Sequence, residues 1–314
     1  MRILITGGCG YVGTELVKSL IQKKIFVKVI DLMWFDSPLI YLKSKYLKIL
    51  KKDYRDINAF DLKNIDCVIH LANVANDPSV ELNPSLSWEI NTLGMQILSE
   101  KCIMSKISKF IYASSGSVYG VKKEKEVTEK LSLEPISIYN KTKMTAERIL
   151  LSYSKNLNSY IIRPATVCGF SERMRLDLSV NILTFSALKN KMITVFGGNQ
   201  LRPNIHIKDM VRVYEHFLFK RNKTGIYNAG FENEKIINIA KKIQKKIECK
   251  IKVKNSNDPR SYRLNSDKLI KSGFKPHFGI NDAIKELTSR YKKNELIDNP
   301  KSYNINWLKK KIEK

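Results

Sequence analysis

The fold is decided by the opening of the chain, which reads Met1-Arg2-Ile3-Leu4-Ile5-Thr6-Gly7-Gly8-Cys9-Gly10-Tyr11-Val12-Gly13. An apolar run typical of a buried strand comes first, and residues 11–23 then carry Val12, Leu16 and Leu20 at helical spacing. The glycines between them allow a tight turn, a close approach of the backbone to a phosphate group, and close packing of helix on strand. Unpaired N–H groups at the start of the helix favour a bound anion. This stretch therefore predicts a strand, a phosphate-binding loop and a helix.

Strands and helices alternate through the first half of the chain. Further strand-like runs occupy residues 26–30, 46–50, 67–71, 110–113 and 160–162, and helical patterns cover residues 84–104 and 137–154. Such alternation is typical of βαβ units, so we expect an α/β protein with a Rossmann-type doubly wound parallel sheet. From about Cys168 the pattern loosens, with helices expected near residues 208–219 and 235–246, which predicts a smaller C-terminal lobe. Residues 298–314 are Lys-rich around Trp307, and we expect a peripheral helix or tail there.

Length and composition indicate a globular protein. The chain has 314 residues, of which 43% are hydrophobic and 27% charged. Its longest apolar runs are strand-sized, so we expect no membrane span and no membrane partner. The sequence opens directly into the glycine loop and leaves no room for a signal peptide, which favours a cytoplasmic protein. The five cysteines are odd in number and widely spaced, so we expect free thiols and no metal site.

The formal charge of +26 is compatible with a nucleic-acid-binding protein. However, of the 56 basic residues 12 are Arg and 44 are Lys, and they are spread along the chain in short runs such as Lys309-Lys310-Lys311. Proteins that read nucleic acids cluster Arg on one face for bidentate contacts. Scattered Lys is typical of solvated surfaces, so we expect no nucleic-acid partner, although the basic bias favours anionic small molecules.

Acidic residues at the ends of two strands indicate the cofactor. Asp31 ends the second strand, 18 residues beyond Gly13, where a carboxylate can accept both hydroxyls of an adenosine ribose. A carboxylate there repels the 2′-phosphate of NADP, so the pattern favours NAD, and the alternative is a plain turn residue. Asp53 follows the third strand, where it either bonds the adenine or simply occupies a surface turn.

A second group of residues predicts a proton-transfer site. Tyr139 and Lys143 lie four residues apart on an expected helix and therefore share a face. An ammonium beside a phenol favours the phenolate, so we expect Lys143 to lower the pKa of Tyr139 and make it a general base. A Lys-rich chain produces this spacing by chance, but Ser115, after the preceding strand, brings a hydroxyl to the same place. Ser115 is expected to bond the oxygen that Tyr139 deprotonates.

With these motifs in place, the chain resembles the extended short-chain dehydrogenase/reductase family, in its nucleotide-sugar epimerase/dehydratase branch. The resemblance covers nearly the whole chain. It rests on the glycine loop, Asp31, Ser114-Ser115 and the Tyr139/Lys143 pair, and continues through Arg163-Pro164-Ala165-Thr166-Val167, Arg202-Pro203-Asn204-Ile205-His206, Tyr227-Asn228-Ala229-Gly230 and Asp258-Pro259-Arg260. The family implies NAD bound mainly by residues 1–167 and a nucleotide-diphosphate sugar bound mainly by residues 168–297, with interleaved elements. It also implies a homodimer formed through the helices at 84–104 and 137–154.

The resemblance implies roles for individual residues. Ser115, Tyr139 and Lys143 match the family's catalytic positions. The implied cofactor-binding residues, besides Tyr139 and Lys143, are Gly7, Gly10, Tyr11, Val12, Gly13, Asp31, Asp53, Tyr54, Leu71, Ala72, Asn91 and Pro164. The candidate substrate-binding residues are Asn76, Ser115, Gly116, Ser117, Arg173, Arg175, Asn181, Arg202 and Arg260. Asn76 stays open, because it is equally suited to begin the turn before Pro78.

Departures from the family pattern narrow the expected reaction. The family's 4,6-dehydratases follow the catalytic hydroxyl with Asp-Glu, which remove water, whereas this chain has Gly116 and Ser117 there. Dehydration is therefore disfavoured, and a nucleotide-sugar epimerase acting through a 4-keto intermediate is the leading interpretation. A nucleotide-sugar 4-dehydrogenase or 4-ketoreductase is the alternative. A non-catalytic dinucleotide-binding protein is disfavoured by the intact set of Ser115, Tyr139 and Lys143.

Residues 171–181 read Ser-Glu-Arg-Met-Arg-Leu-Asp-Leu-Ser-Val-Asn. This segment is similar to a subgroup of the family that includes a GDP-heptose 4-dehydrogenase of bacterial capsule synthesis. Two Arg in a loop before Asn181 are expected to grip a diphosphate or a sugar. The alternative is that Arg173 and Arg175 are surface charges.

Overall fold

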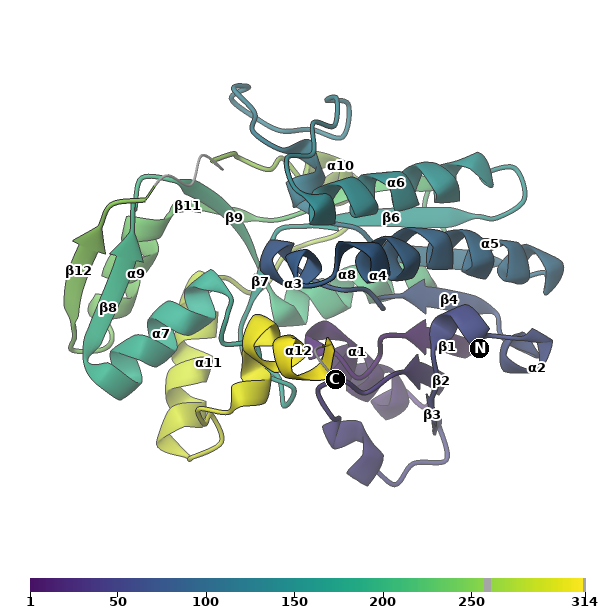
Figure 1. Cartoon of the computed structure of the whole chain (residues 1–314), viewed down its shortest axis with the longest axis horizontal. Coiled ribbons are helices and arrows are strands. Elements are labelled where there is room, and N and C mark those ends of the chain that lie inside the picture. The colour runs from purple at the N-terminus through teal and green to yellow at the C-terminus, as the bar shows by residue number, and fades with distance from the viewer. Residues whose placement is uncertain (257–260, 313–314) are drawn as a thin grey trace.

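Strand β1 (Arg2–Thr6) lies inside the main sheet of the molecule. The computed structural model describes residues 1–256 and 261–312, and within them seven strands pair in the order β10-β6-β5-β4-β1-β2-β3 (Figure 1). The other six strands are β2 (Phe26–Asp31), β3 (Leu47–Lys51), β4 (Cys67–His70), β5 (Lys109–Ala113), β6 (Ser159–Pro164) and β10 (Gly225–Ala229). Every pair is parallel, so all seven strands end at the same edge. The expected Rossmann-type doubly wound α/β fold is confirmed.

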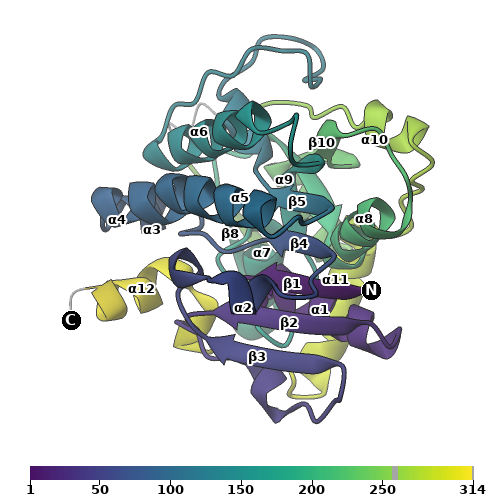
Figure 2. The ribbon, with the colours of Figure 1, turned by 90° about the vertical axis from the view of Figure 1, so that its right-hand side faces the viewer.

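Helices cover both faces of this sheet (Figure 2). One face carries α1 (Tyr11–Gln22) and α8 (Ile207–Phe219), and the other carries α5 (Gly94–Met104), α6 (Ile138–Ser152) and the short α2 (Ala59–Leu62). Alternate residues of β1 serve the two layers: Ile3 and Ile5 pack with α1 and α8, whereas Leu4 packs with α5 and α6. Because both faces are covered, the inner strands are buried and appear in the sequence as unbroken apolar runs.

The helical pattern at residues 84–104 forms three consecutive pieces: α4 (Pro84–Trp88), the π turn η3 (Glu89–Leu93) and α5. Asn91, in the π turn, points inward, where its side-chain oxygen accepts from the Val74 N–H at 2.8 Å and its amide donates to Thr142 Oγ1 at 3.1 Å. The carbonyl of Ile90 accepts a hydrogen bond from the Tyr54 hydroxyl. Single π turns are frequent at functional sites. This one fixes the loop that follows β4.

The C-terminal lobe lies at the edge where the parallel strands end. Its two small sheets have the orders β11-β9-β7 and β12-β8, made by β7 (Thr166–Cys168), β8 (Met192–Phe196), β9 (Leu201–His206), β11 (Glu232–Lys235) and β12 (Lys250–Lys254). Helices α7 (Ser179–Asn190), α9 (Ile236–Gln244) and α11 (Ile280–Lys292) pack with β8 in a separate apolar core. The remaining short elements are η1 (Pro38–Tyr41), η2 (Tyr54–Asp56), α3 (Asp77–Glu81), η4 (Gly116–Tyr119) and α10 (Asp267–Lys271).

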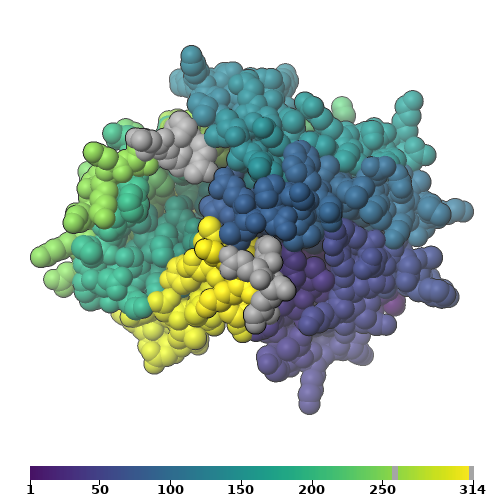
Figure 3. All heavy atoms as spheres, in the orientation of Figure 1, coloured from purple at the N-terminus to yellow at the C-terminus, as the bar shows by residue number. Residues whose placement is uncertain are grey.

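The end of the chain forms a helix, and this helix packs against the domain that contains the main sheet. The 3-10 turn η5 (Pro300–Ser302) and α12 (Asn304–Ile312) follow α11, and α12 contacts α3. In the space-filling view this segment, in yellow, lies between the lobe and the blue and purple residues of the main domain (Figure 3). Asn304 and Leu308 are buried, so α12 is packed on one side rather than wholly exposed.

Two further expectations concern the whole chain. Over the part of the chain that the structure describes, no helix has both the length and the apolar character needed to cross a membrane. All five cysteines are free thiols, and Cys168 is buried.

Candidate functional site

A large cavity lies between the ends of the parallel strands and the C-terminal lobe. It has a volume of about 920 Å³ and is lined by the loops after β1, β2, β4 and β5, by residues of α6 and α7, and by strand β8. Tyr303, Asn304 and Leu308 from the end of the chain also line it. Parallel α/β sheets bind their ligands at this edge. The volume lies at the upper end of the range for ligand pockets.

The glycine loop forms one wall of the cavity and requires glycine for steric reasons. Gly7 has φ +72°, and a Cβ there would lie 2.4 Å from the backbone nitrogen of Ala72. A Cβ on Gly13 would lie 2.6 Å from the carbonyl oxygen of Gly7. The cavity-lining residues in this region are Gly7, Gly10, Tyr11, Val12, Gly13, Leu71 and Ala72. The loop is thus a cradle of bare backbone at the start of α1, as a pyrophosphate requires.

Asp31 lies at the end of β2, beside this cradle. Its carboxylate accepts hydrogen bonds from the N–H groups of Met33 at 2.7 Å and Cys9 at 3.0 Å. Burial raises the pKa of Asp31, while these two bonds and the charge of Arg173 act in the opposite direction. Oδ1 and Oδ2 are thereby oriented toward the loop. The arrangement suits a carboxylate that accepts further bonds from ribose hydroxyls.

Asp53 and Tyr54 line the cavity beyond Asp31. Burial acts to raise the pKa of Asp53, but bidentate bonds from Arg55 outweigh it, so the pKa of Asp53 is lowered. The Tyr54 hydroxyl is used on the carbonyl of Ile90. Both side chains therefore already have protein partners, and they contribute shape to this end of the cavity.

Ser115, Tyr139 and Lys143 come together on the opposite wall, as their spacing predicts. Lys143 Nζ donates to the carbonyl oxygen of Ala113 at 2.8 Å, at the end of β5, and lies 6.0 Å from the centre of the Tyr139 ring. Ser115 Oγ is 2.8 Å from Ser117 Oγ, and Ser117 donates to Asn140 Oδ1 at 2.6 Å. Ser115, Ser117, Tyr139 and Lys143 all line the cavity.

The pKa of Tyr139 is raised, whereas its spacing to Lys143 predicts a lowered pKa. Burial raises the pKa of Tyr139 to about 12, and burial lowers the pKa of Lys143 to about 7. The groups that act to lower the pKa of Tyr139 are Arg175 and the hydroxyl of Ser115. The main reason is desolvation, which disfavours the charged form of both side chains, and the negative charge of Asp77 raises the pKa of Tyr139 further.

A buried polar network lies directly behind this wall. Arg163 donates from Nε to Glu147 Oε1 at 2.9 Å and from Nη2 to Oε2 at 2.5 Å, and from Nη1 to the Tyr119 hydroxyl at 2.7 Å. The hydroxyl of Ser114 donates to Glu147. Glu147 lies one helical turn beyond Lys143 on α6, and Ser114 precedes Ser115. The network therefore ties the end of β5 to α6 and fixes the spacing of the candidate residues.

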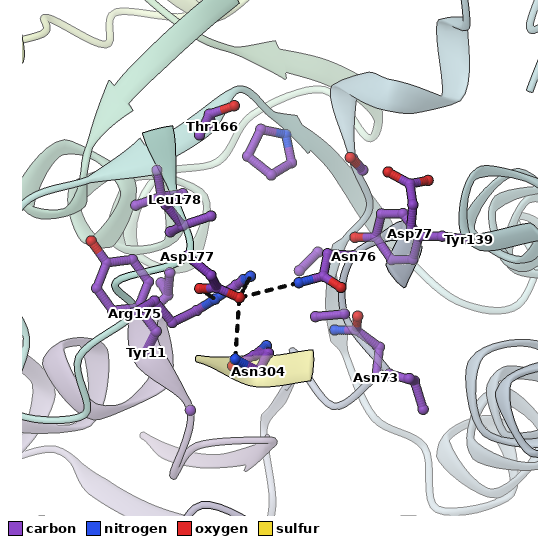
Figure 4. A pocket seen from close by; sticks show the side chains of 18 of the residues that line it. Tyr11, Asn73, Asn76, Asp77, Tyr139, Thr166, Arg175, Asp177, Leu178 and Asn304 are labelled. Carbon is purple, nitrogen blue, oxygen red and sulfur yellow. Dashed lines mark hydrogen bonds and ion pairs between the residues drawn. The ribbon is translucent and has the colours of Figure 1, made fainter. Parts of the chain in front are cut away.

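Two predicted substrate residues, Asn76 and Arg175, meet at the carboxylate of Asp177 (Figure 4). Arg175 donates from Nε and Nη2 to the two oxygens of Asp177 at 2.9 and 3.0 Å, and Asn76 Nδ2 donates to Oδ2 at 3.3 Å. The backbone N–H of Asn304 reaches the same oxygen at 3.3 Å. All four residues line the cavity, and Asn76 lies on the side of Tyr139.

Arg173 occupies a different place from Arg175. Its guanidinium carbon is 4.0 Å from the centre of the Phe35 ring, and Nη2 donates to Asn304 Oδ1 at 2.9 Å. It interacts electrostatically with Arg175 and Asp177 and, more weakly, with Asp31 and Tyr11, and its contact with Phe35 places it on the side of the cavity that carries Asp31. Arg173 is 6% exposed, so the alternative of a surface charge is wrong for this residue.

The other predicted residues divide between the cavity and its supporting layer. Pro164 and Arg202 line the cavity. Asn181 is buried behind it, where Oδ1 accepts from the Gly169 N–H at 3.0 Å and Nδ2 donates to the Arg175 carbonyl at 2.9 Å. Gly116 also lies behind the wall, since a Cβ there would be 3.1 Å from the carbonyl oxygen of Pro164. Asn91 holds the loop after β4, as described above, and Arg260 lies outside the described residues.

Sequence reasoning missed several residues of the cavity: Trp34, Phe35, Asp177, Tyr262 and Asn304. Asp77, which the sequence offers beside Asn76 as a residue for sugar hydroxyls or for the turn before Pro78, also lines the cavity. Two signals were present in the chain. Trp34 and Phe35 follow Asp31 after Leu32 and Met33, and Trp307 is an aromatic residue in a Lys-rich tail. Trp307 Nε1 donates to the carbonyl of Trp34 at 2.5 Å, so these two signals belong to one contact.

A family model described as the NAD dependent epimerase/dehydratase family matches residues 3–230, which is more than half of the chain. The chain belongs to this family. The resemblance to nucleotide-sugar enzymes of the extended short-chain dehydrogenase/reductase type is thereby confirmed, and NAD is the cofactor.

The names of similar proteins include both epimerases and dehydratases. The chain is 30% identical over 262 residues to the uncharacterized UDP-glucose epimerase YtcB of Bacillus subtilis, covering 78% of this chain and 81% of that protein. It is 30% identical to a dTDP-D-glucose 4,6-dehydratase of Dictyostelium discoideum, covering 77% and 61%. The structure of UDP-glucuronic acid 4-epimerase from Bacillus cereus, in complex with UDP-glucuronic acid and NAD, matches with a TM-score of 0.82 at 26% identity, covering 94% and 100%.

The residues of this chain fit NAD. The glycine loop packs tightly against the backbone of Ala72 and lines the cavity at the start of α1, and Asp31 stands beside it with an oriented carboxylate. Lys143 and Tyr139 lie further along the same cavity. The cavity continues from there to the lobe, which leaves room for a second ligand.

Proposed function

We propose that this protein is an NAD-dependent nucleotide-sugar epimerase that acts through a 4-keto intermediate. The observation that carries the proposal is one continuous cavity with the glycine loop and Asp31 at one end, Ser115, Tyr139 and Lys143 in the middle, and the lobe at the other end. This order brings a cofactor and a second ligand to the same three side chains. Membership of a family with several nucleotide-sugar epimerases supports it.

Each of the three residues has a task in the proposed reaction. Tyr139 takes the proton of the C4 hydroxyl, Ser115 bonds the same oxygen, and Lys143 holds the ribose next to the nicotinamide. NAD, when bound, would supply a hydride acceptor for C4 and a hydride donor to the opposite face of the 4-keto sugar. Tyr139 then gives its proton back to the C4 oxygen. Protons and electrons balance over the cycle, so no external oxidant or reductant is consumed.

The proton transfer needs a lowered pKa at Tyr139. Burial raises the pKa of Tyr139 to about 12, which favours the protonated phenol at neutral pH. Ser115 and Arg175 already act to lower it. Lys143, whose pKa burial lowers to about 7, exchanges a proton close to neutral pH. We infer that these three groups together prepare Tyr139 as the general base.

Dehydration is disfavoured in this proposal because the wall after Ser115 offers no acid and base for removing water. Gly116 has no side chain, and the hydroxyl of Ser117 is hydrogen-bonded to Asn140. Asn76, Arg175, Ser117 and Arg202 are proposed to contact the nucleotide-diphosphate sugar. Net oxidation or reduction at the same carbon is the alternative, and the experiment below separates it from epimerisation.

The test uses purified protein with GDP-, UDP-, dTDP- and CDP-sugars and no added cofactor. Absorbance at the NADH band and NMR of the products are followed together. Conversion to the C4 epimer without a lasting NADH band is expected. A stoichiometric NADH burst that stalls until a keto acid is added means a dehydrogenase and overturns the epimerase proposal. A product lacking the C6 oxygen overturns it in favour of a dehydratase.

We also propose a cytoplasmic homodimer. Exposed apolar side chains lie along the segment from α4 to α5 and are proposed to form the dimer interface: Trp88 is 37%, Leu93 50% and Met104 82% exposed. The five free thiols fit a reducing compartment. Light scattering after gel filtration is expected to give twice the chain mass for the natural protein and for the control Phe60→Lys, and the chain mass for Leu93→Lys/Met104→Lys. A dimer that persists in the double variant contradicts this interface.

A further inference from the structure

The cofactor end of the cavity contains a buried cation with an unused donor. Arg173 is 6% exposed and is held on two sides, by the Phe35 ring at 4.0 Å and by Asn304 Oδ1 at 2.9 Å. Nη1 makes a further, long bond of 3.4 Å to the carbonyl of Met174. Nε is buried and has no hydrogen-bond partner within residues 1–256 and 261–312. A buried charge with an unsatisfied donor is costly unless a ligand completes it.

The surroundings of Arg173 indicate an anion as that ligand. Arg173 interacts electrostatically with Arg175 and Asp177 and, more weakly, with Asp31 at the end of β2 and Tyr11 in the first turn of α1. Its contact with the Phe35 ring, in the loop after β2, places it on the side of the cavity that carries Asp31. The loop after Asp31 reads Leu32-Met33-Trp34-Phe35-Asp36 and offers no cationic or amide side chain to a phosphate.

Within the part of the chain that the structure describes, the other cations that line the cavity are Lys52, Lys143, Arg175, Lys189 and Arg202. Lys52, Arg175 and Lys189 are paired with carboxylates, and Lys143 donates to the carbonyl of Ala113. Arg173, by contrast, keeps a buried donor without a hydrogen-bond partner among the described residues.

The end of the chain holds Arg173 in this place. We call residues 298–308 the C-terminal strap. Asn304 bonds Arg173 directly, Trp307 Nε1 donates to the Trp34 carbonyl at 2.5 Å, and Lys301 forms an ion pair with Asp36. The carbonyl of Ser302 accepts from the Leu176 N–H at 2.8 Å. The strap thus joins the loop after β2 to the loop after β7 across the cofactor end of the cavity.

We propose that Arg173 is a ligand of the NAD pyrophosphate and that the C-terminal strap, through Asn304, holds it there and retains the cofactor. The glycine loop at the start of α1 is then one phosphate-binding element, and the guanidinium of Arg173 is the second. The planar guanidinium can form two hydrogen bonds to phosphate oxygens at once. This assignment depends on NAD as the cofactor and not on the reaction. It replaces the expectation that Arg173 binds the substrate.

The test measures the exchange of bound NAD in the full-length holoprotein. Purified protein is mixed with excess radiolabelled NAD, and label retained after desalting is followed over time. Loss of a charge-assisted bond to phosphate is expected to speed exchange by about tenfold to hundredfold in Arg173→Gln. Asn304→Ala, which keeps the cation but frees it, is expected to speed exchange by about threefold to tenfold. Asn306→Ala, on the exposed side of α12, and Arg221→Gln, an exposed Arg, are controls that stay within about twofold of the natural protein.

Two molecules that compete with NAD for the site distinguish the loss of a phosphate contact from a general loosening of the cofactor site. ADP-ribose contains the diphosphate and adenosine does not. Arg173→Gln is expected to weaken competition by ADP-ribose about tenfold or more and to leave adenosine within about twofold. Equal weakening of both competitors, or no change in either, overturns the assignment of Arg173. If Arg173→Gln does not fold, Arg173→Lys, which keeps the charge without the fork, takes its place. If Asn304→Ala exchanges NAD at the rate of the natural protein, the role of the strap is overturned.

Discussion

Replacing Glu147 by Gln tests whether the buried network behind Ser115 and Lys143 supports the site. The side chains of Arg163 and Glu147 are 3% and 1% exposed and share two hydrogen bonds at 2.9 and 2.5 Å. Gln keeps the shape of Glu but removes the negative charge, so Arg163 keeps a buried charge without its counterion. Ser114 also loses its charged acceptor. The end of β5 and α6 should then be held less firmly.

The expected loss of stability follows from the burial of the pair. Removing one partner from a buried ion pair destabilises a protein by roughly 3–5 kcal/mol. With an unfolding entropy of about 2.1 cal/mol/K per residue, a chain of this length loses about 5–8 °C in melting temperature. Thermal unfolding of the natural protein, Glu147→Gln, Arg163→Met and the double variant gives the coupling energy of the pair. The double variant should be more stable than Glu147→Gln, because no uncompensated charge is left.

An exposed ion pair provides the matched control. Glu295 pairs with Arg290, and both side chains are 42% exposed. Glu295→Gln should change the melting temperature by less than about 1.5 °C, because solvent screens such a pair. The reasoning is refuted if Glu147→Gln melts within about 1.5 °C of the natural protein. It is equally refuted if Glu147→Gln and Glu295→Gln destabilise the fold alike.

Three further predictions concern the site itself. Tyr139→Phe should lower turnover by about 10²–10⁴-fold while the protein keeps its NAD. The control Tyr41→Phe, at a side chain that is 82% exposed, should leave turnover and NAD content unchanged. Turnover is measured by NMR of the products, and NAD content by extraction from the protein. Asp31→Asn should lower the ratio of the affinities for NAD and NADP by about tenfold or more, because the charge that repels a 2′-phosphate is gone. Calorimetry with each dinucleotide measures the two affinities, and an unchanged affinity ratio contradicts the role of Asp31. Lys143 has a pKa of about 7 in the folded protein, against 10.5 for a lysine side chain in water. Between these two pH values, the unfolded state therefore binds more protons than the folded state does. Relative to Lys143→Met, the ligand-free protein should therefore gain stability as the pH rises from about 7 to 10.5, by at most ~5 kcal/mol, and urea unfolding at several pH values that shows no such gain contradicts a buried lysine.

The main sheet could be predicted because its information is local. Each inner parallel strand is buried on both faces, so residues such as Ile3, Leu4 and Ile5 form a continuous apolar run that stands out in the sequence. The lobe lacks this signal. Strand β12 reads Lys250-Ile251-Lys252-Val253-Lys254 and is mostly exposed, and β11 is entirely polar or charged. Such strands exist because a neighbour pairs with them, and pairing partners distant in sequence leave no local pattern.

The same contrast applies to the site. The glycine loop, Asp31 and Ser115 follow directly from strands, so the end of each strand predicts their place. The pKa of Tyr139 could not be predicted from its spacing to Lys143, because the sign of the shift depends on how deeply both groups are buried. Asn304 could not be placed either. Its contacts with Arg173 and Asp177 span 131 and 127 residues, and a polar residue in a Lys-rich tail gives no indication of burial.

Asp177 links the two ends of the cavity. Its carboxylate accepts from Arg175 and Asn76 toward the candidate sugar side, and from the backbone of Asn304 on the strap. Opening the strap to release NAD would therefore also break a contact of the carboxylate that orients Arg175 and Asn76. Under the proposed function, the sugar side is best ordered while the cofactor is enclosed. An epimerase needs this coupling, because the hydride taken from C4 must return to the same sugar before either ligand leaves.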